Sequence, residues 1–149
     1  MDDQVESPPE RASALAAEIR VLAGKLKRRL DDQAHAGDLT SSQISVILRL
    51  EKGGPATASS LARAEAMRPQ SMATIIAALD AAGLVSGAPD PVDGRQTILS
   101  LTDGCRQWVK ERRAARQDWL SGTIQARLSV SEQETLAAAL GLLKRLTDD

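Results

Sequence analysis

Apolar residues recur every three or four positions over most of the chain, which is the spacing of one face of an amphipathic helix. The first such run extends from Ala12 to about Ala34. Its apolar stripe consists of Leu15, Ile19, Leu22, Leu26 and Leu30. A second run follows Thr40, and Gln43 stands three residues later, which is the spacing of a capping box. The pattern predicts a long first helix and a second helix that starts at Thr40 and ends at Gly53-Gly54-Pro55.

Two shorter helices are predicted in the next part of the chain. Thr57 is placed to cap a helix that carries Leu61 and Ala62, and Met67-Arg68-Pro69 interrupts the pattern after it. Pro69 suits the first position of a fourth helix, and Gly83 suits its end. The apolar positions between them have helical spacing and are Met72, Ile75, Ile76 and Leu79.

The pattern changes between Leu84 and Leu101, where two short apolar runs flank a polar segment that contains Asp93-Gly94. This arrangement predicts two strands joined by a hairpin turn. After Thr102 a long helix is expected to reach about Arg127, and Ser131 with Glu134 predicts the start of a last helix. The expected fold class is mainly α with a small β-hairpin: a helix-turn-helix, then a wing, with long helices on either side.

A length of 149 residues fits one domain. Residues 1–10 are acidic and contain proline, so we expect a flexible amino terminus followed by a single domain over residues 11–149. Within it, residues 40–102 form the predicted compact lobe, and residues 11–36 and 103–147 form the flanking helices. These long helices carry apolar stripes that the compact lobe is too small to cover, which predicts a homodimer.

The composition sharpens this picture without changing it. The chain has 24 Ala and 19 Leu but no Phe or Tyr, so its core must consist of small and aliphatic side chains. The formal net charge is −1, so contact with a polyanion has to be local. One Cys and one His provide no metal-ligand spacing, and no cofactor is expected. The lone cysteine and the lack of an export signal or an 18-residue apolar stretch predict a cytoplasmic protein without a membrane segment.

The fourth helix carries the candidate chemistry. If its apolar stripe faces the core, the opposite face presents short or amide side chains: Gln70, Ser71, Ala73, Thr74 and Ala77. Such a face fits the major groove of DNA, where an amide such as Gln70 can pair with adenine through two hydrogen bonds. Arg68 and the free amides at the starts of both helices suit phosphate groups. For any single residue, a solvated helix face remains the alternative.

The hairpin tip supplies a second candidate element because it carries Asp90, Asp93 and Arg95. Arg95 is placed to reach a minor groove or the flanking phosphates, with Asp93 holding its guanidinium group in position. The alternative is an ordinary surface ion pair, worth roughly 0 to 1 kcal/mol.

These segments resemble the MarR family of regulators over nearly the whole chain, from about Leu15 to Leu146. The matching segments are Leu39–Gln43, Leu61–Glu65, Arg68–Met72, Leu79–Val85, and Asp90–Arg95 leading to Leu99–Thr102. The resemblance implies a homodimeric winged helix-turn-helix repressor of a palindromic operator, whose first, fifth and sixth helices form the dimer interface. Its fourth helix would enter the major groove. With the start of the third helix added, the predicted DNA contacts are Thr57, Ser59, Arg68, Gln70, Ser71, Thr74, Asp93 and Arg95.

Two positions depart from the family pattern. Thr74 and Gly87 stand where similar sequences often have Arg, so we expect fewer phosphate contacts and a shallower salt dependence. These departures and the neutral charge leave a protein-binding winged helix open as an alternative. An enzyme is not indicated, because the sequence contains no nucleophile–base pair, phosphate-binding glycine loop or metal cluster.

The resemblance also implies release from DNA by a small aromatic or anionic effector. Trp108 and Trp119 fall on one face of the predicted fifth helix with Arg112 between them, and His35 lies near the end of the first. The candidate ligand residues are therefore His35, Trp108 and Arg112, although packing tryptophans and a capping histidine are the favoured interpretation. Cys105 begins the fifth helix and has no second cysteine in its chain to form a disulfide with, so a role as an oxidation sensor is not favoured. A helix terminus can lower the pKa of a thiol, so the reactivity of Cys105 stays open.

Overall fold

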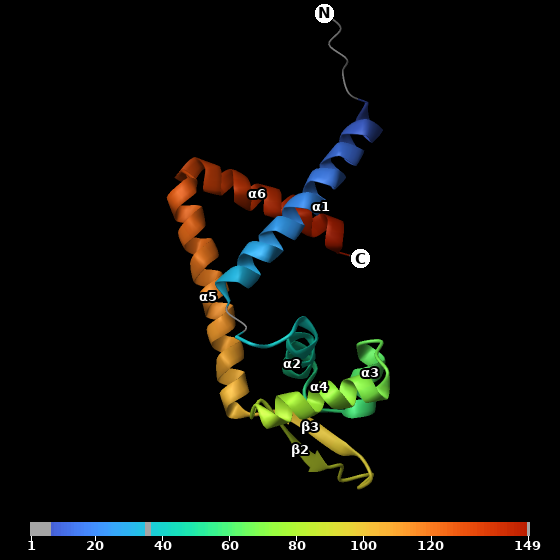
Figure 1. The fold of residues 1–149 in the computed structure, drawn as a ribbon. Helices are drawn as coiled ribbons and strands as arrows, with labels where there is room; N and C mark the ends of the chain where they lie inside the picture. Colours follow the sequence, from blue (N-terminus) through green and yellow to red (C-terminus); the bar gives the residue numbers. More distant parts are fainter. Residues whose placement is uncertain (1–6, 35–36, 149) are drawn as a thin grey trace, which may run out of the picture. The chain divides into compact units, whose positions relative to one another are not determined.

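The computed structural model describes residues 7–34 and 37–148, in which six helices and three short strands form (Figure 1). The elements are α1 (Pro8–Gln33), α2 (Ser41–Gly53), β1 (Ala56–Thr57), α3 (Ala58–Ala64), α4 (Pro69–Ala81), β2 (Val85–Pro89), β3 (Thr97–Leu101), α5 (Asp103–Arg127) and α6 (Val130–Thr147). This order confirms the predicted fold class, mainly α with a hairpin wing. Within the described ranges, no helix is long and apolar enough to cross a membrane.

The chain divides into two compact units. The central unit comprises His35–Ala114, and the terminal unit comprises Met1–Ala34 together with Ala115–Asp149. The predicted lobe ended at residue 102, but the central unit continues into α5. The reason is that Cys105 and Val109 of α5 are buried in the core of this unit.

The core of the central unit brings four helices together. Its fully buried side chains come from α2, α3, α4 and the start of α5, and are Val46, Ile47, Leu61, Met72, Leu79 and Cys105. Aliphatic and sulfur-containing side chains thus fill the interior, as the lack of Phe and Tyr requires. Burial on this scale fixes the helix-turn-helix against its supporting helices and leaves the opposite face of α4 to solvent.

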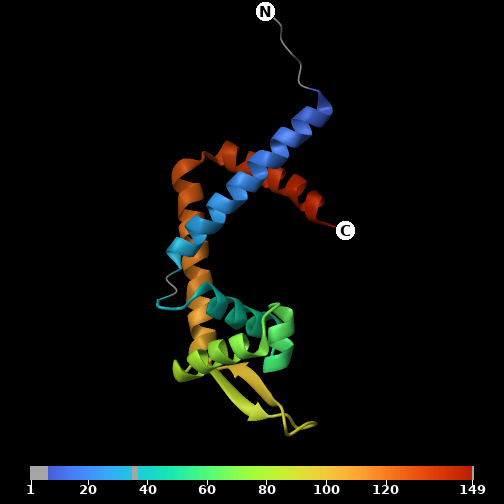
Figure 2. The same cartoon turned by 45° about the vertical axis from the view of Figure 1, so that its right-hand side comes forward.

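The sheet has the strand order β1-β3-β2 and is antiparallel throughout. Strands β2 and β3 form the wing, which pairs from Val85 with Leu101 to Pro89 with Thr97. Figures 1 and 2 both show this hairpin beside α4. Strand β1 was not predicted, because its two residues are defined only by their pairing with Leu99 and Ile98 far along the chain.

Helix ends follow local hydrogen bonds, and most were predicted correctly. Thr40 accepts a hydrogen bond from the Gln43 N–H at 3.2 Å, and α4 begins at Pro69. The start of α6 was predicted wrongly. The chain contains two overlapping Ser-x-x-Glu patterns, and the earlier one is used: Glu132 accepts a hydrogen bond from the Ser129 N–H at 2.9 Å.

The first helix starts earlier than predicted, at Pro8 instead of Ala12. Ser7 and Glu10 form a capping box in front of it, with the Ser7 N–H donating to Glu10 Oε2 at 2.9 Å. Residues 8–10 therefore belong to the helix and not to a flexible terminus.

The terminal unit has a different character, because neither α1 nor α6 contains a buried residue. Apolar side chains of these helices line a hollow of about 520 Å³: Leu15, Ile19, Ala139, Leu142, Leu143 and Leu146. Leu142 is 61% exposed and Leu146 is 72% exposed. The predicted apolar stripes are thus present and lack cover within the described part of a single chain.

Candidate nucleic-acid interface

The turn between α3 and α4 is held by hydrogen bonds from both sides. Met67 N–H donates to the Ala62 carbonyl at 2.9 Å, and Ala66 adopts a left-handed backbone with φ of 52°. The Glu65 carboxylate accepts hydrogen bonds from Arg49 Nε at 2.8 Å and from Ser45 Oγ at 2.9 Å. The Arg49 hydrogen bond lowers the pKa of Glu65 below its usual value, so the carboxylate stays charged. Helix α2 thereby anchors the turn that sets the direction of α4.

Helix α4 presents the predicted face to solvent. Met72 and Leu79 are buried, whereas Gln70, Ser71, Ala73, Thr74 and Ala77 are exposed. The Thr74 hydroxyl donates to the Gln70 carbonyl at 3.1 Å, so its proton is used within the helix. Arg68 precedes the helix at the N-cap position and is exposed. The start of α4 therefore combines an amide side chain with a neighbouring cation.

The helix before it is capped by one of the predicted contact residues. Thr57 Oγ1 accepts a hydrogen bond from the Ser60 N–H at 3.2 Å and lies 3.3 Å from Ser59 Oγ. Thr57 is half-buried, and Ser59 is exposed. Both residues lie at the same end of α3, and of the two it is Ser59 that offers an accessible hydroxyl.

The wing turn is ordered by aspartates that bind backbone amides. Asp90 accepts a hydrogen bond from the Val92 N–H at 2.9 Å, and Asp93 accepts one from the Arg95 N–H at 3.1 Å. The expected ion pair between Asp93 and the Arg95 guanidinium is not formed among the described residues. An aspartate bonds readily to a backbone N–H two residues later, and this local bond orients the Asp93 carboxylate toward the backbone of the turn. The Arg95 side chain is consequently exposed and able to reach outward.

A groove of about 740 Å³ joins these elements. It lies between α3, α4 and the wing, and its lining includes Thr57, Ser59, Ala73, Ala77, Asp80, Gly87, Arg95 and Thr97. Asp80 and Thr97 were not predicted at this surface. Asp80 stands seven residues after Ala73, a spacing of two helical turns that places both on one side of α4 and offers the missed signal.

Arg95 lines this groove, and two further arginines lie on neighbouring segments: Arg63 in α3 and Arg68 at the N-cap of α4. Arg63, Arg68 and Arg95 are exposed, and none of them forms an ion pair with a carboxylate in the described ranges. Gly87, in strand β2 of the wing, is one of the two positions at which the sequence departs from the family pattern. A Cβ atom added there would lie 2.6 Å from Thr97 Cγ2, so a side chain would force Thr97 to move.

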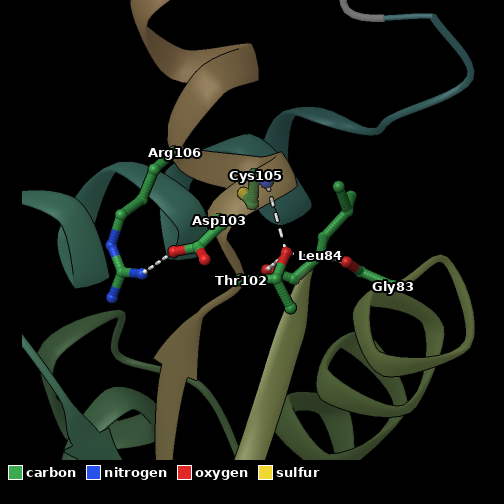
Figure 3. A network of polar contacts seen from close by, with 6 residues as sticks. All are labelled: Gly83, Leu84, Thr102, Asp103, Cys105 and Arg106. Carbon is green, nitrogen blue, oxygen red and sulfur yellow. Dashed lines mark hydrogen bonds and ion pairs between the residues drawn. The ribbon is translucent and has the colours of Figure 1, made fainter.

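A hydrogen-bond network joins the end of α4 to the start of α5 (Figure 3). The Thr102 hydroxyl donates to the Gly83 carbonyl at 2.7 Å and accepts from the Cys105 N–H at 3.2 Å. Gly83 has a φ of 72°, the left-handed conformation that ends many helices. Thr102 is therefore both the N-cap of α5 and a clamp on the residue that follows α4.

The predicted ligand residues fall in different places. Trp108 is half-buried and packs against the core of the central unit, as the packing interpretation expects. Trp119 is half-buried in the terminal unit. Arg112 is half-buried with its Nε atom enclosed. His35 lies outside the described residues.

The structure bears on the reactivity of Cys105, which the sequence leaves open. Its side chain is fully buried, and this burial raises the pKa of the thiol, although the charge of Arg106 acts in the opposite direction. The loss of hydration on burial has a larger effect on the thiol pKa than the positive charge of Arg106. In the part of the chain that the structure describes, no group of three or more His, Cys, Asp or Glu side chains is arranged to hold a metal ion.

Comparisons with known proteins identify the same region. A sequence model of the MarR family matches residues 39–97. An uncharacterised HTH-type transcriptional regulator of Mycobacterium bovis is 36% identical over 135 residues, which cover 91% of this chain and 94% of that protein.

Solved structures extend the likeness to the fold. A putative transcriptional regulator of Pseudomonas aeruginosa has a TM-score of 0.78 and 35% identity, covering 92% of this chain and 96% of that one. A mutant of S. aureus MepR bound to an oligodeoxyribonucleotide has a TM-score of 0.72 and 20% identity, covering 90% and 98%. At that identity the MepR structure supports the fold alone.

Proposed function

The chain belongs to the MarR family of transcriptional regulators, and we propose that it represses transcription by binding a palindromic operator as a homodimer. The family also confirms the prediction that the protein is a regulator and not an enzyme. The observation that carries the proposal is the groove between α3, α4 and the wing, which Arg95 lines and which lies beside the exposed and mostly uncharged face of α4.

In the proposed complex, α4 enters the major groove and the wing follows the adjacent backbone. Gln70 stands in the first turn of α4, the part of a recognition helix that approaches base edges. Arg68 and Arg95 supply phosphate contacts on either side of it, which fix the position of the helix without reading sequence. Ser59, Ser71 and Thr74 add hydroxyl groups that suit phosphate or base contacts, and Asp93 acts by ordering the wing turn.

The homodimer is supported by the uncovered apolar faces of α1 and α6. A second copy of the chain offers the same faces, and a two-fold interface of this kind is self-complementary. Two α4 helices would then address half-sites about one helical turn apart on the DNA. A symmetric dimer also presents each arginine of the DNA surface twice, so local contacts with phosphates can form although the net charge is −1 per chain.

Release by a small aromatic or anionic effector is a further part of the proposal. Trp108 and Arg112 lie one turn apart on α5 and are both half-buried, so they would combine an aromatic face with a cation. Titration with aromatic acids should change tryptophan fluorescence and weaken DNA binding together. A fluorescence change without an effect on DNA binding would contradict the regulatory role.

The DNA-binding proposal is tested by fluorescence anisotropy with the DNA upstream of the gene, measured at several salt concentrations. We expect sequence-selective binding that weakens with salt, and Arg95→Ala should reduce the logarithmic salt slope by about two, one contact per protomer. Arg127→Ala removes the same charge from the terminal unit and serves as the control, with a small effect on the slope. Binding that is equally weak on every duplex would overturn the proposal and favour a protein-binding role.

A further inference from the structure

Helix α4 differs from a typical reading helix in its charges. Its sequence, Pro69–Ala81, contains no Lys or Arg. Arginine and lysine make the commonest specific contact with guanine, because they donate to its O6 and N7 atoms. Guanine reading from this helix is therefore confined to the flanking Arg68, which precedes it. The bases under the helix itself must be recognised by other chemistry.

The exposed face offers that chemistry in the form of an amide and methyl groups. Gln70 and Ala77 lie two turns apart on the solvent side of α4, with Thr74 between them. The Thr74 hydroxyl donates its proton to the Gln70 carbonyl at 3.1 Å, so Thr74 offers a methyl group and an acceptor instead of a free donor. An amide pairs with the N6 and N7 atoms of adenine, and methyl groups of Ala and Thr contact the thymine C5-methyl.

We infer that α4 reads a run of A·T base pairs, with Gln70 on an adenine and the methyl groups of Thr74 and Ala77 on thymine methyls. This inference rests on the proposed DNA binding and specifies which base pairs the recognition helix selects. Asp80 follows Ala77 by one turn and also lines the groove, so its carboxylate would meet the base pair next to the A·T run, where it can accept from the N4 amino group of a cytosine. Arg68 and Arg95 then bind phosphates at the borders of this run.

The test begins with selection of binding sites from random duplex DNA by the purified full-length protein. The selected half-site should contain an A·T run, and selection with Gln70→Ala should relax the preference at one adenine. That position marks the location of the helix on the DNA. Each nearby thymine is then replaced by uracil, which removes only the C5-methyl group and leaves the protein unchanged.

Each contacted methyl should contribute about fourfold to affinity. Thymines between the two half-sites serve as the control, and their replacement should change the affinity by less than about 1.5-fold. The Ala77→Gly variant then tests which side chain contacts the thymine methyl. With this variant, uracil replacement of the thymine beneath Ala77 should no longer lower the affinity about fourfold, whereas replacement of the other contacted thymines should still do so. Because both duplexes are measured with the same variant, a general loss of helix stability cancels in this comparison.

The outcomes separate the inference from the proposed function. The A·T assignment would be overturned if the selected sites have G·C pairs beneath Gln70, Thr74 and Ala77 of α4, or if replacing thymine by uracil does not change the affinity. Either result would leave the proposed DNA binding intact. Failure to select any sequence would instead overturn the proposed function. Unchanged thymine effects in Ala77→Gly would remove Ala77 from the contact.

Discussion

The central and terminal units use apolar residues in opposite ways. In the central unit, side chains of α2, α3, α4 and the start of α5 bury one another, and Ile47, Leu61 and Leu79 are almost completely enclosed. In the terminal unit, α1 and α6 have no buried residue, and leucines on both helices remain accessible. Helix α5 shows the difference within one element, because its buried residues, Cys105 and Val109, both lie in its central-unit half.

This contrast indicates where the stability of each unit originates. A closed core stabilises the central unit within one chain, so its free energy of unfolding should not depend on protein concentration. Helices with uncovered stripes gain most of their stability from tertiary or quaternary packing. The terminal unit should therefore depend on a second chain, and its stability should rise with concentration.

The largest effect is expected for Leu143→Glu, which places a charge in the apolar hollow of α1 and α6. Two copies of the side chain are lost per dimer at about 1.5 to 3 kcal/mol each, so dimerisation should weaken by about 3 to 6 kcal/mol. Sedimentation equilibrium measures this change. Ala137→Glu, on an exposed position of the same helix, is the control and should leave the dimer intact. If Leu143→Glu and the natural chain dimerise with the same affinity, the apolar faces of α1 and α6 do not form the dimer interface, and the contrast between the two units is wrong.

The next effect concerns the closed core of the central unit. Leu79→Ala removes a side chain that is completely buried, and such changes lower the free energy of unfolding by about 2 to 5 kcal/mol. Urea denaturation at two protein concentrations should show the same loss at both. Leu142→Ala in α6 is the matched variant. It should lower the free energy of unfolding only at the protein concentration at which the dimer forms. A strong concentration dependence for Leu79→Ala would contradict a self-contained central unit.

Local signals predicted the central unit well because its helix ends are formed by near neighbours. The Thr40–Gln43 capping box, Pro69 at the start of α4 and the stop at Gly83 depend on residues a few positions apart. The solvent face of α4 followed from helical periodicity. Strand β1 escaped prediction, because its two residues become a strand only by pairing with β3 about forty residues later.

The differences between prediction and structure have a common physical cause. In each case two local interactions or environments compete at one residue or helix end, and the sequence pattern does not show which of them prevails. Asp93 was expected to bind the Arg95 guanidinium, but its carboxylate instead accepts a hydrogen bond from the nearer backbone N–H. For Cys105 the sequence leaves the reactivity of the thiol open, and burial raises the pKa of this thiol. In α6, two equally spaced capping patterns are present, and the structure uses the one that begins at Ser129.

A smaller effect is expected where α5 joins the central unit. Thr102→Val removes a hydroxyl that caps α5 and also binds the Gly83 carbonyl, so we expect a loss of about 2 kcal/mol. Thr102→Ser retains both hydrogen bonds and should recover most of the loss. Thermal unfolding followed by circular dichroism compares the two variants. A Thr102→Val protein that is as stable as the natural chain would show that the hydroxyl network does not contribute to stability.

The smallest effect concerns the ion pair that anchors the α3–α4 turn. Glu65→Gln removes the charge that accepts hydrogen bonds from Arg49 and Ser45, and it should lower the free energy of unfolding by about 1 kcal/mol at neutral pH. The folded pKa of Glu65 is lowered, mainly by the Arg49 hydrogen bond. Its contribution is therefore complete above the unfolded pKa, about 4.3, and is lost as pH falls through the folded pKa.

Urea denaturation of the natural chain and Glu65→Gln at pH 7, 5, 4 and 3 measures this difference. The two proteins should converge in stability as the carboxyl group is protonated, because the neutral acid resembles the amide. Glu132→Gln is the matched control in the terminal unit, where the pKa of Glu132 is also lowered by hydrogen bonds with Ser129. That change should affect the end of α6 and leave central-unit unfolding unaltered. A Glu65→Gln difference that persists at pH 3 would show that shape, and not charge, anchors the turn.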